Sequence, residues 1–107
     1  MCQKNISVRF TNSPTDIDWE YPGGNGADYK EVPNSAKTGE IEAFPKVLAA
    51  IRKAIGPSKI LSIAAPGKKT DMIAYTKETG PKIWPSVDYI NVSAICYYSN
   101  VVNSALN

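Results

Sequence analysis

Three acidic side chains alternate with apolar ones in a short stretch near the amino terminus. Asp16, Asp18 and Glu20 are separated by Ile17 and Trp19. Because successive side chains of a strand point to opposite faces, an extended chain would place all three carboxyl groups on one face. Alternate residues lie roughly 6 to 7 Å apart, so the groups would interact and at least one would stay protonated near neutral pH. A protonated carboxyl group in a site is what general acid catalysis requires.

The same pattern has a simpler interpretation, which is a strand with one face in water. Strand interiors are depleted in Asp and Glu, so a row of them needs water, hydrogen bonds or a ligand to compensate the charge. Ile17 and Trp19 favour a site, because their face suits burial beneath a layer of helices. The sequence Tyr-Pro-Gly-Gly at 21–24 would end such a strand. On the pattern alone, a wet surface and a catalytic site both remain open.

Other kinds of site are excluded or disfavoured by the composition. The chain has no histidine, which removes Ser-His-Asp and Cys-His arrangements. Cys2 and Cys96 are too few and too far apart for a disulfide framework or a zinc site, so no metal and no cofactor are predicted. The run at 67–70 looks like the end of a phosphate-binding loop, but the glycine needed five positions earlier is Ser62. Acid-base chemistry would therefore fall to carboxylates, tyrosines or lysines.

Length and composition limit the class of protein. The chain has 107 residues, of which 43% are hydrophobic and 21% charged, as in an ordinary globular domain, and this length allows at most one domain. Its formal charge is +2 and its lysines are scattered, which argues against a nucleic-acid partner. No apolar run reaches the roughly 18 to 20 residues of a membrane span, and no signal-peptide pattern follows the first residues. We expect neither nucleic-acid binding nor membrane insertion.

The elements that must position the acidic stretch alternate between strand and helix. A helix is predicted at 39–55, where Phe44, Leu48 and other apolar residues recur at three- and four-residue steps. The other expected elements are a short strand at 6–10, the acidic strand at 15–20, a polar surface loop at 23–38, a buried strand at 60–65, a helix at 71–79 and a strand at 87–92. Gly-Pro at 80–81 would close the second helix. The βαβαβ order predicts an α/β fold with a parallel sheet and right-handed crossovers.

The acidic stretch and its surroundings resemble a known family. The sequence Asp-Ile-Asp-Trp-Glu-Tyr-Pro-Gly at 16–23 is similar to the signature of the glycoside hydrolase family 18 chitinases, D-x-x-D-x-D-W-E. The likeness is closest to fungal members and continues through 44–55, 61–66, 71–76 and 87–92. The resemblance implies a partial (β/α)8 TIM barrel of about three βα units, with the site at the carboxyl ends of parallel strands. The chain would then divide into a divergent segment at 1–14, a partial catalytic domain at 15–92 and a divergent segment at 93–107.

The resemblance also implies a role for each residue of the stretch. Glu20 would be the general acid that protonates the departing glycosidic oxygen, and the N-acetyl group of the substrate would be the nucleophile. Asp18 would orient that acetamido group and stabilise the oxazolinium ion, with Asp16 supporting it from beneath. Trp19 and Tyr21 would bind substrate. The implied substrate is chitin or a chitooligosaccharide, and the resemblance implies an extracellular, secreted protein, although the chain shows no signal peptide.

Three departures from the family pattern bear on activity. The first Asp of the signature is replaced by Ser13, and the family's Met-x-Tyr-Asp after Asn91 and Val92 is replaced by Ser-Ala-Ile-Cys at 93–96. A closed barrel takes on the order of 250 residues, whereas this chain has 107. We therefore expect a truncated or misassembled piece with little or no turnover. A non-catalytic chitin-binding relative and a fragment without its own function are the alternatives, and the sequence leaves open endo or exo cleavage and the oligomeric state.

Overall fold

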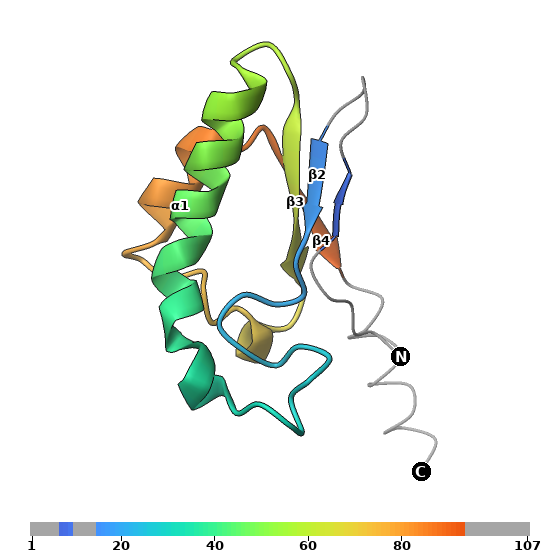
Figure 1. Cartoon of the computed structure of the whole chain (residues 1–107), viewed down its shortest axis with the longest axis vertical. Helices are drawn as coiled ribbons and strands as arrows, with labels where there is room; N and C mark the ends of the chain where they lie inside the picture. The colour runs from blue at the N-terminus through green and yellow to red at the C-terminus, as the bar shows by residue number, and fades with distance from the viewer. Residues whose placement is uncertain (1–6, 10–14, 94–107) are drawn as a thin grey trace.

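The described residues form two layers, a sheet and the helices that cover one of its faces (Figure 1). The structure is a computed structural model that describes residues 7–9 and 15–93. In chain order its elements are β1 (Ser7–Arg9), β2 (Thr15–Asp18), the 3-10 helix η1 (Asn34–Lys37), α1 (Thr38–Ile55), β3 (Leu61–Pro66), the 3-10 helix η2 (Lys69–Asp71), α2 (Gly80–Ile83), the 3-10 helix η3 (Trp84–Ser86) and β4 (Tyr89–Ser93). α1 runs along the sheet, and α2 and η3 lie beside it on the same face.

The sheet has the strand order β1-β2-β3-β4, and its last three strands are parallel. Ile17, Ile63 and Ile90 are paired at one level across these strands, so their side chains share a face. This parallel arrangement, with α1 between β2 and β3, confirms the predicted α/β class. β1 pairs antiparallel with β2, which makes the sheet mixed. Closure of the sheet into a (β/α)8 barrel stays a prediction.

α1 covers the sheet with a stripe of apolar side chains. Phe44 and Leu48 lie on this stripe and are fully buried, as the three- and four-residue spacing predicted. The helix matches the predicted range of 39–55 to within one residue. Gly56 ends it in the left-handed region, with φ = 82°, and donates its N–H to the carbonyl oxygen of Arg52. None of the helices at 15–93 combines the length and the hydrophobicity needed to cross a bilayer.

The second helix predicted at 71–79 is wrong. After Asp71, the last residue of η2, this segment has turns and no α-helix, and α2 begins at the Gly-Pro pair that was expected to end a helix. The N–H of Thr76 donates to the hydroxyl oxygen of Thr79 at 2.8 Å, and that hydroxyl donates to the carbonyl of Ala74 at 2.6 Å. Such local side-chain bonds compete with helical hydrogen bonding. Pro81 then favours a helix start, because its fixed φ suits the first turn and its missing N–H is not needed there.

The hydrophobic core lies between the sheet and the helices. Its fully buried members come from both layers and are Ile17, Phe44, Leu48, Leu61, Ile63, Ala74 and Ile83. Phe44 contacts two aromatic rings edge-on, Trp19 at a centroid distance of 5.8 Å and Tyr75 at 5.6 Å. Because Trp19 directly follows β2 and Tyr75 belongs to the segment after β3, Phe44 fastens α1 to the chain near the carboxyl ends of both strands.

An ion pair fastens α1 to the opposite end of the sheet. Arg52 lies 2.6 Å from Asp88, and it also donates to the carbonyl of Lys59 at 2.7 Å. Asp88 accepts a second hydrogen bond from the N–H of Leu61. The bond from Leu61, followed by that from Arg52, lowers the pKa of Asp88. These contacts fix the amino-terminal ends of β3 and β4. A site would therefore be formed at the opposite edge of the sheet, by the loops that follow the carboxyl ends of the strands.

Candidate active site

The acidic row begins on β2, where the structure has the predicted alternation, but β2 ends at Asp18, so the strand predicted at 15–20 is two residues too long and Glu20 lies beyond it. Thr15 and Ile17 are buried, whereas Asp16 and Asp18 are only partly buried. Asp16 pairs with Ser62 of β3 in the parallel register, and the Ser62 hydroxyl donates to its carboxylate at 2.7 Å. The lowest carboxylate is therefore held by the neighbouring strand. Ser62 was not predicted as part of the site, although a polar residue in an otherwise apolar strand was a usable signal.

Trp19 and Glu20 follow the end of β2. The Trp19 ring is partly buried and packs on Phe44 of α1, so it lies on the helix side. This placement supports the packing role expected for Trp19, and its contact with substrate stays a prediction. Glu20 is only 7% exposed and is joined to Tyr21 by a cis peptide bond. A buried carboxyl group at the carboxyl end of a parallel strand is in the place where α/β enzymes carry catalytic residues.

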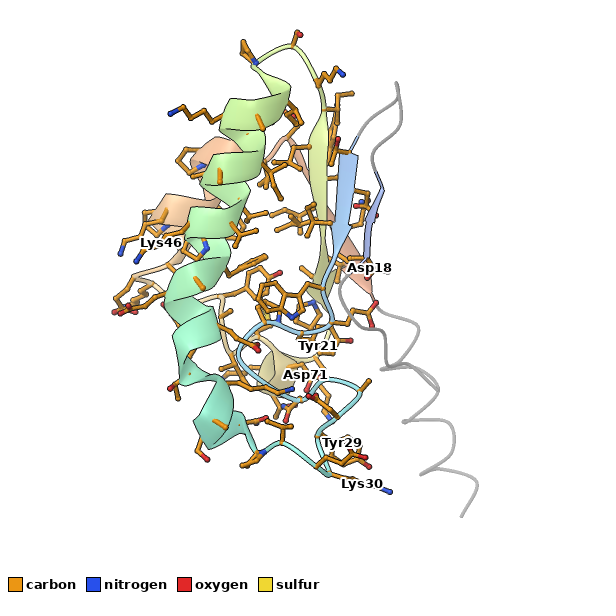
Figure 2. The ribbon with its side chains drawn as sticks, viewed as in Figure 1. Asp18, Tyr21, Tyr29, Lys30, Lys46 and Asp71 are labelled. Atoms are coloured by element: carbon orange, nitrogen blue, oxygen red, sulfur yellow. The ribbon has the colours of Figure 1, made fainter. Side chains whose placement is uncertain are left out.

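Tyr21 brings the acidic residues together. Its side chain is 6% exposed, and its hydroxyl interacts with the Glu20 carboxylate. Burial, followed by the negative charges of Glu20 and Asp71, raises the pKa of Tyr21 to about 12, and Asp18 contributes to the same shift. Figure 2 shows Asp18 at the end of β2, and Tyr21 and Asp71 close together beyond it. The negative charges of three carboxylates, two of them from the predicted row, therefore all contribute to the raised pKa of Tyr21.

Tyr75 extends this group toward β3. Its hydroxyl donates to the carbonyl oxygen of Ala64 at 3.3 Å, and its ring contacts Phe44. Burial, with a further contribution from Tyr21, raises the pKa of Tyr75. The phenol of Tyr75 stays protonated at any physiological pH, so it acts here as a fixed donor.

Asp71 belongs to η2, and the loop after Glu20 holds it in place. The side-chain amide of Asn25 donates to the Asp71 carboxylate at 3.0 Å and to the carbonyl of Thr70 at 3.1 Å. Asn34 completes the arrangement, because its side-chain oxygen accepts the N–H of Asn25 at 2.8 Å and its amide donates to the Asn25 side chain at 2.9 Å. Asp71 and Asn25 were not predicted as site residues. Their contact joins positions 46 residues apart, which no local pattern reveals.

The predicted polar surface loop at 23–38 is a surface loop only in part. Its first residues, including Gly23, Gly24 and Gly26, are buried, whereas the stretch at 29–31 is exposed. The N–H of Gly23 donates to the carboxylate of Glu40 at 2.9 Å, which fastens the loop to the first turn of α1. The polar composition was misleading, because glycines allow the backbone to pack closely and acidic and amide side chains satisfy its buried groups.

Several residues of the predicted site lie at the limits of the described chain. Ser13 and residues 94–96 fall outside the described residues, so the departures from the family pattern at these positions have no structural account. Asn91 is paired with Ala64 across β3 and β4, on the face that carries Asp16 and Asp18. Within 7–9 and 15–93, no group of three or more acidic or cysteine side chains is arranged to hold a metal ion.

Comparison with known proteins identifies the family. No curated protein sequence matches the chain. The family model of the glycosyl hydrolases family 18 matches residues 14–106, which include the acidic row, α1 and the three parallel strands. The match gives the family alone and does not bear out the closer likeness to fungal members. Because it covers most of the sequence, the chain belongs to glycosyl hydrolases family 18.

Proposed function

We propose that this chain carries the catalytic residues of a chitinase-type glycosidase, which hydrolyses β-1,4-linked polymers of N-acetylglucosamine. The observation that supports this most strongly is the position of Glu20, which is buried, interacts with Tyr21 and lies two residues after Asp18, just beyond the carboxyl end of β2. Membership of the glycosyl hydrolases supports hydrolysis of a glycosidic bond. The chitin substrate and the roles below are our proposal.

In the proposed mechanism, Glu20 is protonated when substrate binds. It gives its proton to the glycosidic oxygen as the bond from that oxygen to the anomeric carbon breaks. The carbonyl oxygen of the sugar's own N-acetyl group attacks the same carbon and forms an oxazolinium ion. Asp18 accepts a hydrogen bond from the acetamido N–H and stabilises the positive charge of the oxazolinium ion. Water then opens the ring, giving its proton to Glu20, so that the anomeric configuration is retained.

The other residues of the site support these two carboxyl groups. Asp16, held by Ser62, places a further negative charge on the face that carries Asp18. We propose that Tyr21 orients Glu20, with which it interacts, and that it borders the space where a sugar would bind. We propose secretion as the location, because chitin is an insoluble extracellular polymer.

Replacement of the acid tests this proposal. Release of fluorophore from a chitooligosaccharide glycoside should fall at least about a hundredfold in Glu20→Gln, because general acid catalysis contributes roughly that factor or more. Turnover is expected to be low, since the chain has Ser13 and the run 93–96 in place of family residues, so enzyme should be in excess over substrate. Glu42→Gln, which removes an exposed acid on α1, is the control. Equal release by wild type and Glu20→Gln would exclude Glu20 as the acid.

A second candidate is a chitin-binding relative without catalysis. The sequence after Val92 favours it, because Ser-Ala-Ile-Cys at 93–96 replaces the Tyr and Asp that contact the reacting sugar in the family pattern. The presence of Glu20 opposes it, because a lectin-like relative has no need of the acid. Retention on chitin beads that survives Glu20→Gln, with no hydrolysis by wild type, would identify this function. Absence of a cooperative unfolding transition would indicate a fragment without its own function.

A further inference from the structure

The loops that follow β2 and β3 meet at the edge of the sheet where Glu20 lies. The loop after β2 carries Asn25, and the segment after β3 carries Asp71. The side-chain amide of Asn25 donates two hydrogen bonds across this contact between the loops, here called the junction, one to Asp71 and one to the carbonyl of Thr70. The junction therefore fixes the Asp71 side chain relative to the loop that begins at Glu20.

The backbone of the loop is shaped around this junction. Asn25 is in the left-handed region with φ = 58°, which asparagine tolerates better than most residues. A Cβ on Gly24 would lie 2.2 Å from the side-chain oxygen of Asn34, the atom that accepts the N–H of Asn25. Asn34 closes a ring of two hydrogen bonds with Asn25, so the Asn25 side chain has one orientation. Asp71 is consequently held by a rigid donor.

The Asp71 carboxylate retains capacity to accept hydrogen bonds. An ionised carboxylate has about four acceptor positions. Among the described residues its only hydrogen bond comes from Asn25 and reaches one of the two oxygens. The ion pairs in the described part of the chain are Lys37 with Asp28 and Arg52 with Asp88, and neither includes Asp71. Asp71 is partly exposed and lies near Tyr21, the residue that follows Glu20 (Figure 2).

We propose that Asp71 is a substrate-binding residue of the site, held by Asn25 so that its carboxylate accepts a hydrogen bond from a hydroxyl group of the sugar beside Glu20. Sugar hydroxyls are donors, and a carboxylate fixed by a single amide is a strong acceptor for them. The proposal rests on the proposed function of the chain as a chitin-acting protein. It assigns to the segment after β3 a contact with the substrate in addition to the residues on β2.

Exchange of the two side chains separates binding from loop structure. Asp71→Asn keeps an oxygen that can accept the Asn25 amide but removes the charge. Asn25→Asp places two carboxylates against each other and should destabilise the loop. The double variant Asn25→Asp with Asp71→Asn restores an amide-carboxylate pair between the loops, but with the carboxylate on the other loop. Glu31→Gln, an exposed acid in the same loop, is the control.

The measurements are the affinity for the pentamer of β-1,4-linked N-acetylglucosamine by calorimetry, and the urea unfolding midpoint of each variant. We expect Asp71→Asn to bind at least about tenfold more weakly with little change in midpoint, since a hydrogen bond to a charged group contributes about that factor. The double variant should recover the midpoint lost in Asn25→Asp without recovering affinity.

Two results would overturn the proposal alone. Wild-type affinity in Asp71→Asn would show that the carboxylate does not contact the sugar, and recovered affinity in the double variant would show that the pair only joins the loops. If wild type binds no pentamer and hydrolyses none, both the proposed function and this inference fail. Binding by wild type that is unchanged in Asp71→Asn leaves the function standing and removes only Asp71 from it.

Discussion

Phe44 is the residue whose replacement most directly tests how the helix layer holds the site. Its side chain is 2% exposed and contacts Trp19 and Tyr75 edge-on. Trp19 immediately precedes Glu20, and Tyr75 interacts electrostatically with Tyr21, which contributes to its raised pKa. Replacement of Phe44 by leucine keeps an apolar side chain in the core but removes both aromatic contacts.

The expected cost follows from these contacts. Each edge-to-face pair contributes about 0.5–1.5 kcal/mol beyond burial, so Phe44→Leu should lower the free energy of unfolding by about 1–3 kcal/mol. Phe44→Ala should cost about 3–5 kcal/mol, because it also leaves a cavity. A domain of this size has a total stability of about 5–15 kcal/mol, so the alanine variant approaches the limit of folding. The leucine variant is therefore the informative one.

Urea denaturation followed by tryptophan fluorescence measures this cost. The chain has two tryptophans, so a Trp84→Phe background leaves Trp19 as the only reporter, and Trp19 lies in contact with the replaced ring. Val47→Ala on the same helix is the matched control, because Val47 is 41% exposed and its truncation should change stability by about 0.5 kcal/mol or less. A cost for Phe44→Leu no larger than that of the control would refute the proposed fastening of Trp19 by α1.

Two further predictions concern the ends of the sheet. Asp88 has a lowered pKa in the folded state, so its contribution to stability is present above the ordinary value of 3.8 and is lost as pH falls through the lowered value. The difference in urea midpoint between wild type and Asp88→Asn should therefore be clear at pH 7 and shrink toward pH 2. A difference that does not depend on pH would contradict the lowered pKa of Asp88. Gly24→Ala should lower the free energy of unfolding by about 2 kcal/mol or more, because the new Cβ would be strained at this φ and would displace Asn34. Gly39→Ala is the control, because a Cβ there would have nothing within 4 Å and should not lower stability. Equal melting temperatures of the two variants in thermal denaturation would contradict the packing of the loop.

The strands and α1 could be predicted because each follows a short local period. The spacing of Phe44 and Leu48 requires only that one side of a helix be buried, and the structure buries both. The apolar run at 61–65 likewise requires only that both faces of a strand be covered. The helix at 71–79 failed because its apolar residues had the right spacing while Thr79 offered the backbone other hydrogen bonds. The sequence pattern does not show whether apolar spacing or the hydrogen bonds of Thr79 will determine the backbone structure.

The site was predictable along the strand and not across strands. Alternation placed Asp16 and Asp18 on one face, and the structure agrees. Ser62, which bonds Asp16, lies on β3, and Asp71, which Asn25 holds, follows β3, so their positions depend on the parallel register and on loop packing. Neither is encoded in a window of the sequence. The position of Tyr21 was predicted beside the acid, but the effect of the Asp71 charge on its pKa could be found only from the fold.

The two sequence neighbours of Glu20, Trp19 and Tyr21, both have contacts that fix the backbone, and we call them its apolar and its polar anchor. Trp19 packs on Phe44 in the helix layer. Tyr21 interacts electrostatically with Asp18 and with Asp71, and Asp71 is held by a hydrogen bond from Asn25. A general acid needs its carboxyl group at a fixed angle to the glycosidic oxygen, and two anchors restrict its backbone more than either could alone. The two replaced side chains have different direct contacts, Phe44 with the rings of Trp19 and Tyr75 and Asp71 with the amide of Asn25, so the effects of replacing them should add. Loss of Phe44 should therefore appear mainly as loss of stability and loss of Asp71 mainly as loss of affinity, and the two replacements combined should show the sum of both.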